Sequence, residues 1–368
     1  MWTRPVGSPT VTADTAPEDG VPAVAPPAGT SAATSAGTPA GTPSVTVLIC
    51  AYTERRWDQV VAAVASVQGQ ATPPAQIVLV IDHNPALLGR AVAEFGDAGV
   101  DVVANAEETG LSGARNTGVH HATGEIIAFL DDDARADPDW LGSLVDPYRD
   151  ADVLGTGGVA RAAWPGDRPP WFPREFDWVV GCSYRGLPER QAPIRNPIGA
   201  NMSFRRHAFD VAGGFGSQFG RMGNLPLGCE ETEFSIRLRE FIPGARIVHV
   251  PDAEVDHFVS ADRTKVDYFL RRCVAEGLSK AKVTQHVGND AGLSSERSYV
   301  TSALPTGFVA GFKPGTSPYR WSLARSAMIV AGLAATTLGY GLGRLGLDSV
   351  ASRLAAAPTK KAGKQSSG

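Results

Sequence analysis

The chain has 368 residues, 43 % of them hydrophobic, and a formal net charge of −4 at pH 7. This length suffices for one large or two ordinary domains with a buried core, and the near-balanced charge gives no global electrostatic reason to expect nucleic acid as a partner. The four cysteines contain no CxxC pair, which argues against a zinc site and a disulfide framework and favours a reducing compartment. The N-terminus lacks the charged and apolar blocks of a signal peptide, which argues against export.

Residues 1–43 form a segment dominated by Ala, Pro, Thr, Gly and Ser, with almost no large apolar side chains. Such a segment cannot bury enough apolar surface to offset the conformational entropy that it loses on ordering. We therefore predict a disordered N-terminal tail.

From residue 45 onward, apolar runs alternate with stretches whose apolar residues recur at helical spacing. We predict four buried strands, at 45–50, 77–81, 100–103 and 126–130. Helices are predicted over 57–67, where Gly69 can end the helix, and over 87–95. Strands that alternate with helices indicate βαβ units and a parallel sheet.

The fourth apolar run leads directly into three carboxylates, Asp131, Asp132 and Asp133. In open α/β sheets, ligands bind just outside the carboxyl ends of the strands. Three adjacent negative charges repel one another unless a cation neutralises them, and oxygen ligands favour a hard cation such as Mg²⁺ or Mn²⁺. The triplet predicts a divalent-cation site, although on its own it also fits an acidic turn before the next helix.

The segment 109–118, between the third and fourth strands, is rich in glycine. Ser112 is predicted to cap a helix whose first turn offers backbone N–H groups and the side chain of Arg115. A planar, permanently charged guanidinium suits phosphate or carboxylate recognition, and a Gly-rich turn with a surface arginine is the alternative. After the acidic triplet, Asp137 and Pro138 are predicted to start the next helix.

Residues 161–198 are rich in Trp, Pro and Gly and include Trp178. Long aromatic loops beside the carboxyl edge of a sheet are often lids or acceptor clefts, and packed aromatic loops without a function are the alternative. The next segment, 199–206, contains Asn201 and is predicted to be a strand that approaches the site.

A second acidic segment, with Glu230, Glu231 and Glu233, precedes an apolar helical stripe. The helix dipole favours acidic residues in a first turn, but three exceed what capping needs, so we expect one of them to act as a base. A further strand is predicted over 247–250, and His257 follows it. A lone histidine is more often a structural side chain than a ligand.

The C-terminal part begins with a predicted helix over 262–283 that has a basic side. Residues 326–343 then contain no charged side chain. Because a membrane span needs about 20 apolar residues, we expect this segment to associate with a membrane, and a hydrophobic helix packed on the protein itself is the alternative. Basic residues that can meet anionic lipid are Arg320, Arg325, Arg344, Arg353, Lys360 and Lys361.

Four motifs, in this order and spacing, resemble the family 2 glycosyltransferases of the GT-A fold. They are the first strand with 51–54, then 81–84, 110–116 and the Asp131 triplet. The segment 230–233 is similar to the second acidic motif of that family, which carries the catalytic base. The resemblance spans roughly residues 45–280 and implies an α/β nucleotide-diphospho-sugar transferase fold, with a Rossmann-like, mostly parallel sheet flanked by helices.

The resemblance also implies a role for each matching residue. Donor-binding positions, which hold the base, the ribose, the sugar or the diphosphate, are Tyr52, Glu54, Asp82, Arg115, Asp131 and Asp132. Mn²⁺ or Mg²⁺ is expected at Asp131 and Asp133, with His257 near the metal as a further ligand. The catalytic base falls on Glu231, where many relatives have Asp, and Glu230 is the alternative.

A closer pattern in residues 197–206 and 276–281 resembles bacterial members of the family that are named as glucosyl-dolichyl-phosphate glucuronosyltransferases. From this pattern and from the aromatic loops, we place Asn201 and Trp178 on the acceptor side. The expected segments are a disordered tail (1–43), a glycosyltransferase domain (44–290, with a nucleotide-sugar half 44–160 and an acceptor half 161–290), a linker (291–322), a hydrophobic helix (323–347) and a second disordered tail (348–368).

The resulting hypothesis is a metal-dependent, inverting glycosyltransferase that moves a sugar from a nucleotide-diphosphate sugar, a UDP-sugar by preference, to an acceptor hydroxyl. The acceptor is expected to be a lipid-linked glycan or another cell-envelope polysaccharide, at the cytoplasmic face of the membrane. A catalytically silent carbohydrate- or lipid-binding scaffold is one alternative. A sugar nucleotidyltransferase is another, but it needs a Gly-rich phosphate loop with Lys directly after the first strand, which residues 50–53 lack.

Overall fold

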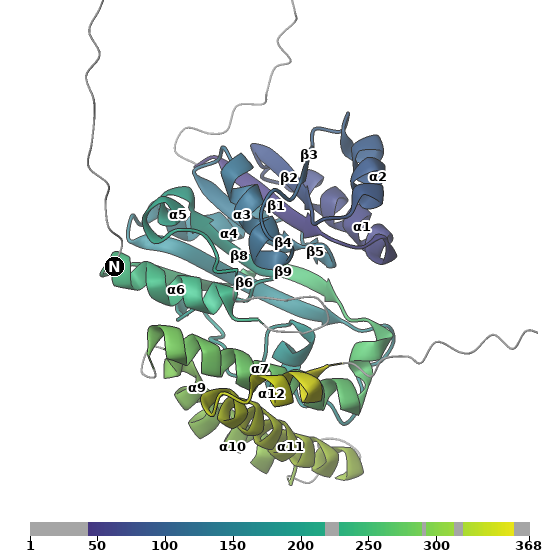
Figure 1. The fold of residues 1–368 in the computed structure, drawn as a ribbon, viewed down its shortest axis with the longest axis vertical. Coiled ribbons are helices and arrows are strands. Elements are labelled where there is room, and N and C mark those ends of the chain that lie inside the picture. The colour runs from purple at the N-terminus through teal and green to yellow at the C-terminus, as the bar shows by residue number, and fades with distance from the viewer. Residues whose placement is uncertain (1–42, 218–227, 289–291, 313–318, 357–368) are drawn as a thin grey trace, which may run out of the picture. The chain divides into compact units, whose positions relative to one another are not determined.

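The sheet has nine strands, and the acidic end of the central strand β4 lies at the carboxyl ends of its four parallel strands (Figure 1). The computed structural model describes residues 43–217, 228–288, 292–312 and 319–356. The parallel strands follow the order β3-β2-β1-β4 and are β1 (Val45–Ala51), β2 (Gln76–Ile81), β3 (Asp101–Ala104) and β4 (Ile126–Asp131). Cys50 pairs with Asp131, and Ala51 pairs with Ile81. The carboxyl ends of β1, β2 and β4 therefore meet at one edge.

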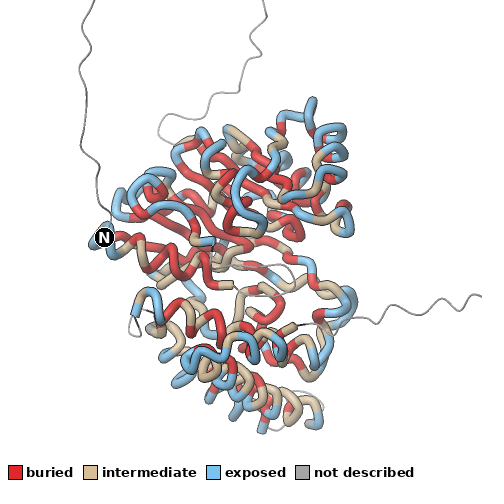
Figure 2. The backbone as a smooth tube through the Cα atoms, in the orientation of Figure 1, coloured by how far each residue is buried: buried red, intermediate tan, exposed pale blue. Residues whose placement is uncertain are grey.

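Helices cover both faces of this sheet, and buried strands lie between them (Figure 2). One face carries α1 (Trp57–Gln68), α2 (Pro85–Phe95) and α4 (Trp140–Val145). The other carries α3 (Leu111–His121), α5 (Arg206–Ala212) and α6 (Glu230–Phe241). This division follows from the strand period of two, because Val47 and Ile49 of β1 face the first group of helices and Leu48 faces the second.

Beyond β4 the sheet becomes mixed. The strands of this half are β5 (Ala134–Ala136), β6 (Val153–Ala163), β7 (Ala192–Pro193), β8 (Asn201–Arg205) and β9 (Arg246–Phe258). β8 pairs antiparallel with β4 and with β6, whereas β6 and β9 are parallel. β9 is longer than the predicted strand over 247–250, and its far end pairs His257 with Ala134, next to the acidic triplet.

Short 3-10 turns connect several of these elements: η1 (Glu54–Arg56), η2 (Asp146–Arg149), η3 (Arg174–Val180) and η4 (Ala261–Thr264). The C-terminal part is helical: α7 (Val266–Val287), α9 (Ser294–Ser298), the π-helix η5 (Tyr299–Ala303), α10 (Leu304–Ala310), α11 (Tyr319–Arg344) and α12 (Asp348–Ala355). Among the described residues, one helix, α11, is long enough and apolar enough to cross a membrane, judged by length and composition only.

Glycines bring the backbones of α7 and α11 into direct contact. A Cβ on Gly277 of α7 would lie 2.0 Å from the carbonyl oxygen of Thr336, and a Cβ on Gly339 of α11 would lie 2.1 Å from that of Val274. Such close packing through small residues resembles the way that helices pack inside membranes. One side of α11 is therefore occupied by the protein itself.

Several predicted boundaries differ from the structure. α3 begins at Leu111, so Ser112 lies inside its first turn and Gly110 is the N-cap. α4 begins at Trp140, and the carboxylate of Asp137 does not cap it but is bound to Arg161, 2.9 Å away.

The C-terminal boundaries differ too. The predicted linker 291–322 contains α9, η5 and α10, and the predicted disordered tail 348–368 begins with α12, whose Ala351 and Ala355 are buried against α7. The predicted N-terminal tail lies outside the described residues apart from Pro43.

Candidate active site

A cavity of about 1000 Å³ opens at the carboxyl edge of the parallel strands. Its lining comes from the ends of β1 and β4, from η3, from the start of α6 and from the C-terminal helices α7, α10 and α11. Both acidic motifs contribute, through the triplet at Asp131 and through Glu230 and Glu231. The topology therefore gathers residues from distant parts of the sequence around one space.

Asp131, Asp133 and His257 form a compact group in this cavity. Each offers one ligand atom, and these three atoms lie within 4.8 Å of one another. The Nε2 atom of His257 is 3.2 Å from Asp133 Oδ1 and 3.9 Å from Asp131 Oδ2. Two carboxylates and one imidazole are a donor set that a divalent cation accepts, so these residues fit a metal ion.

Arginines surround the acidic triplet. Arg56 Nη1 lies 2.8 Å from Asp132 Oδ1 and 2.9 Å from Asp133 Oδ2, and Arg263 Nη2 lies 3.9 Å from the same oxygen of Asp133. Burial would raise the pKa of Asp133, but His257 and the two arginines outweigh it and hold that pKa below its usual range.

Asp132 has a different environment from Asp133. Burial and the neighbouring Asp133 raise the pKa of Asp132 to about 7. Its second oxygen, Oδ2, is buried and has no hydrogen-bond partner within the described structure. Burying a carboxylate oxygen without a hydrogen-bond partner costs free energy. The unpaired oxygen of Asp132 therefore favours a polar ligand or an ion at this end of β4.

The side chain of Arg115 joins the two acidic motifs. Its guanidinium is buried and donates to Glu230 Oε1 at 2.6 Å, to the carbonyl oxygen of Gly199 at 2.9 Å and to Asp131 Oδ1 at 3.3 Å. A Cβ on Gly199 would lie 3.2 Å from Arg115 Nη2, so a larger residue there would crowd the guanidinium. Burial alone would lower the pKa of Arg115, but Glu230 and Asp131 hold it above the usual range.

The three glutamates at the start of α6 have different partners. Glu230 is held by Arg115, and Glu233 binds Arg237 one turn later with N···O distances of 2.7 and 2.9 Å. Glu231 is half-buried at the cavity, and within the described part of the chain its carboxylate accepts only a 3.3 Å bond from the hydroxyl of Thr232. Burial and the adjacent Glu230 raise the pKa of Glu231 to about 7, where a carboxylate can take up and release a proton near neutral pH.

The N-cap residue of helix α6, Cys229, has a strained backbone conformation. Cys229 has a φ of +76°, in the left-handed region that residues other than glycine rarely adopt. Such conformations cost free energy and are held only where the surrounding structure requires them. Here the turn at Cys229 directs Glu230 and Glu231 toward the cavity.

The structure places some of the predicted donor-side residues at the cavity and others away from it. Tyr52 and Asp82 line the cavity, and the ring of Tyr52 is 47 % exposed. The carboxylate of Asp82 accepts bonds from Asn105 Nδ2 at 2.7 Å and from the backbone N–H of Gly110 at 3.0 Å. Glu54 is exposed and does not line the cavity.

Of the two predicted acceptor-side residues, one lines the cavity and one does not. Trp178 lines the cavity, and its Nε1 donates to the hydroxyl of Tyr299 at 3.2 Å. Asn201, in contrast, is fully buried and does not line the cavity, so the structure does not bring it to the predicted acceptor side. Its amide group accepts from Trp140 Nε1 and donates to the carbonyl oxygens of Val159 and Ala253, at 2.8, 3.0 and 2.8 Å.

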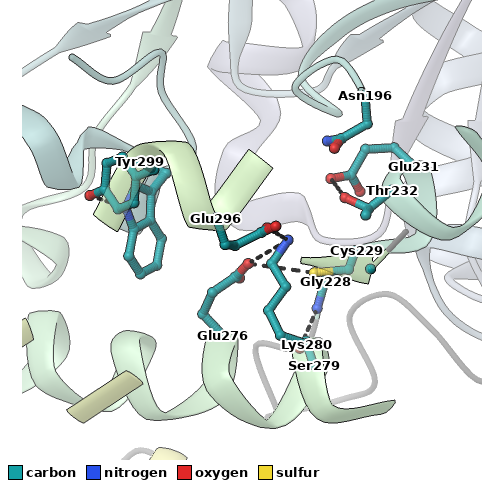
Figure 3. A network of polar contacts seen from close by, with 12 residues as sticks. Asn196, Gly228, Cys229, Glu231, Thr232, Glu276, Ser279, Lys280, Glu296 and Tyr299 are labelled. Atoms are coloured by element: carbon teal, nitrogen blue, oxygen red, sulfur yellow. Dashed lines mark hydrogen bonds and ion pairs between the residues drawn. The ribbon is translucent and has the colours of Figure 1, made fainter. Parts of the chain in front are cut away.

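The sequence reasoning missed several residues that line the cavity. They are Arg56, Cys182, Arg195, Arg263, Arg272, Glu276, Lys280, Glu296 and Tyr299. Figure 3 shows part of this group, with Lys280 and Glu296 pointing toward each other beside Glu276. Arg272, Glu276 and Lys280 are spaced at i, i+4 and i+8, which places them on one helix face. This spacing is the sequence signal that could have predicted their grouping.

Comparison with known proteins gives consistent matches. The family described as "Glycosyl transferase family 2" matches residues 46–213. A glucosyl-dolichyl phosphate glucuronosyltransferase of Haloferax volcanii is 36 % identical over 239 residues, which are 64 % of this chain and 76 % of that protein. The succinoglycan biosynthesis protein ExoM of Rhizobium meliloti is 26 % identical over 202 residues, 54 % of this chain and 60 % of that protein.

Solved structures with a similar fold include the following one. It is a mannosyltransferase from Pyrobaculum calidifontis, in complex with GDP-Man and Mn²⁺. The TM-score is 0.51 at 19 % sequence identity, and the superposition covers 81 % of this chain and 88 % of that one.

Proposed function

This chain belongs to glycosyl transferase family 2, and from that premise we propose that it transfers a sugar from a nucleoside-diphosphate sugar to a hydroxyl group of a lipid-linked acceptor, with inversion at the anomeric carbon. A UDP-sugar is the proposed donor. The observation that carries the proposal is that one cavity is lined both by a compact Asp131, Asp133 and His257 group and by Glu231.

Asp131, Asp133 and His257 would hold Mn²⁺ or Mg²⁺. When bound, such an ion supplies positive charge beside the diphosphate leaving group, whose negative charge grows as the glycosidic bond breaks. Arg115 adds a permanent positive charge at the same place and orients Asp131 through their 3.3 Å contact. Tyr52 and Asp82 are proposed to receive the base and ribose of the donor, with Asp132 toward the ribose or sugar.

Glu231 is the proposed base. Its carboxylate takes the proton of the acceptor hydroxyl while that oxygen forms a bond to the anomeric carbon and the bond to the diphosphate oxygen breaks. Glu230 is a poorer candidate, because its carboxylate is engaged by Arg115 at 2.6 Å. A single displacement of this kind inverts the configuration at the anomeric carbon.

A lipid-linked acceptor is supported by the exposed apolar residues of the C-terminal helices. They are Phe308, Val309, Phe312, Val330, Leu338, Leu345, Leu347, Val350 and Leu354. We name this group the apolar surface. Because one side of α11 packs on α7, we propose that the apolar surface lies on the cytoplasmic face of a membrane and that α11 does not span it. The relative from Haloferax volcanii is named for a dolichyl phosphate substrate, which is consistent with this acceptor class.

A donor panel tests the proposal. Purified protein is incubated with Mn²⁺ and a set of nucleotide sugars, with and without an extract of lipid-linked sugars, and nucleoside diphosphate release is measured. We expect one donor to be consumed faster with acceptor, and Asp133→Asn to reduce this rate at least about 100-fold because a metal ligand is lost. Asp137→Asn is the matched control, because Asp137 binds Arg161 and does not line the cavity. Donor binding without turnover in the wild type would instead favour a silent scaffold.

A further inference from the structure

The cavity has a second charged wall, apart from the metal group and built mainly on α7. Arg195, Arg272 and Lys280 line it, and their side chains are only 8 %, 16 % and 12 % exposed. We name these three residues the basic wall. Figure 3 shows Lys280 reaching into the space between α7 and the start of α6, where Cys229 and Glu231 lie.

Two carboxylates pair with the basic wall. Lys280 Nζ lies 2.7 Å from Glu296 Oε1 and 3.5 Å from Glu276 Oε1, and Arg272 Nη1 lies 2.9 Å from Glu276 Oε2. Arg195 Nη2 donates to Glu296 Oε1 at 2.8 Å. Within this group, three cations against two carboxylates leave one positive charge in excess. Glu231, which also lies near Lys280, offsets that charge only in its ionised form.

All five groups carry their charges near neutral pH. Burial would lower the pKa of Lys280, but Cys229, Glu296 and Glu276 outweigh it and hold that pKa above its usual range. Burial would raise the pKa of Glu296, but Lys280 and Arg195 lower it to about 2. A buried charge in excess is costly unless something pairs with it. The basic wall therefore has room for one anionic group.

The cavity beyond the basic wall is aromatic and apolar. Its lining there includes Trp178 and Tyr299 from η3 and η5, Leu304 from α10, and Leu333 and Tyr340 from α11. α10 and α11 also carry the apolar surface on their outer sides. A ligand that follows this path has an anionic group at the basic wall and an apolar chain toward the proposed membrane side.

We propose that the basic wall binds the phosphate of the acceptor, a sugar joined to a lipid chain through a single phosphodiester. This rests on the proposed function, because it places the sugar hydroxyl of that acceptor beside Glu231. A phosphodiester carries one negative charge, which matches the one positive charge in excess, and Arg and Lys are the side chains that recognise phosphate oxygens. The lipid chain runs between η5, α10 and α11.

Binding of a simple lipid phosphodiester tests the proposal without donor or metal. Methyl farnesyl phosphate is titrated into the full chain by calorimetry, at concentrations below micelle formation, and farnesol and inorganic phosphate are titrated separately. We expect the wild type to bind methyl farnesyl phosphate at least about tenfold more tightly than either comparison compound, because only this probe has both the charge and the chain. Equal affinity for farnesol, or equal affinity for inorganic phosphate, would overturn the proposal.

Variants on α7 assign the effect to the basic wall. Lys280→Met is expected to weaken methyl farnesyl phosphate binding at least about tenfold and to leave farnesol binding unchanged, since only the charge contact is lost. Lys280→Arg retains the charge and is expected to restore most of the affinity. Lys282→Met is the matched control, because Lys282 lies on the same helix and does not line the cavity.

The remaining outcomes separate this inference from the proposed function. If Lys280→Met folds, by its thermal melting, and binds methyl farnesyl phosphate as the wild type does, the inference is wrong. The same holds if the variant instead loses affinity for UDP-glucuronate, because the basic wall would then bind a donor carboxylate. A wild type that shows the expected lipid preference but consumes no nucleotide sugar contradicts the proposed function alone.

Discussion

The protonation state of Glu231 depends on the residues immediately around it. Burial and the adjacent Glu230 raise its pKa to about 7, while Lys280 and Arg115 act in the opposite direction. A general base works only as the carboxylate, so its activity is present above this pKa and is lost as the pH falls through it. The local electrostatics of one residue thus set the useful pH range of the proposed reaction.

We predict that kcat rises with pH up to about 7 and then levels off, measured at saturating donor and acceptor over roughly pH 5.5–8.5. Glu231→Gln is expected to lower kcat by about 10²–10⁴ and to remove this pH step, because the amide cannot accept the proton. Glu240→Gln serves as the control, since Glu240 is exposed on the same helix outside the cavity. An unchanged profile in Glu231→Gln would assign the base to another residue.

The sequence could predict which residue types gather at the site, but it could not predict their partners. The Asp131 triplet and the 230–233 segment are recognisable because they follow a buried strand and start a helix. The choice between Glu230 and Glu231 depends on Arg115, which is 115 positions from Glu230 in the sequence. The burial of Asn201 could not be predicted for the same reason, because the three hydrogen bonds of its side chain go to residues on other elements.

At the scale of elements, the contact between α7 and α11 depends on small residues. Gly339 faces the backbone of α7, whereas a Cβ on Gly341, two positions later on the same helix, would meet nothing within 4 Å. These two glycines therefore separate the effect of packing from the intrinsic helix propensity of alanine.

We predict that Gly339→Ala lowers the free energy of unfolding by about 1–3 kcal/mol, because its Cβ forces the two backbones apart. Gly341→Ala is expected to raise it by up to about 1 kcal/mol, since alanine is the better helix former and nothing obstructs it. Chemical denaturation of both variants measures the difference. Equal stability of the two variants would mean that α11 does not pack on α7 as described.

Apolar periodicity predicted most elements in this chain, but not the direction of the later strands. The sheet is parallel through β4, where βαβ units impose it. Beyond β4 the sheet is mixed, with β8 antiparallel to β4 and β6 and with β6 parallel to β9. These directions could not be predicted, since an apolar run does not specify which strand it pairs with. The helices inside residues 294–310 differ from the predicted linker, and each is too short, at five to seven residues, to give a clear apolar periodicity.

At the scale of the whole molecule, the proposed membrane-binding region combines the apolar surface with the basic residues of α11 and α12. Arg320 and Arg344 lie on α11 with the exposed Val330, and Arg353 lies on α12 with the exposed Leu354. Buried apolar area and attraction to anionic lipid both contribute to binding of this kind. The composition of the sequence predicted membrane association, and the packing of α11 on α7 supports the proposal that the protein binds at the membrane surface.

We predict that Val330→Glu weakens binding to phosphatidylglycerol vesicles at least about tenfold, because it places a charge in the apolar surface. Co-sedimentation measures this, with thermal melting to verify the fold. Val211→Glu is the matched control, because Val211 is 45 % exposed on α5, compared with 54 % for Val330, and lies outside the C-terminal helices. Equal loss in both variants would point to a nonspecific charge effect and against the proposed region.

One consequence of the buried Arg115 concerns how members of this family can be recombined. Its guanidinium touches Asp131 from the parallel half of the sheet and both Gly199 and Glu230 from the later half. A chimera that joins the first half of this chain to the second half of a relative must keep all of these partners, or it inherits an unpaired buried ion. An exchange of sheet halves between relatives therefore requires a seam that preserves this arginine and its three contacts.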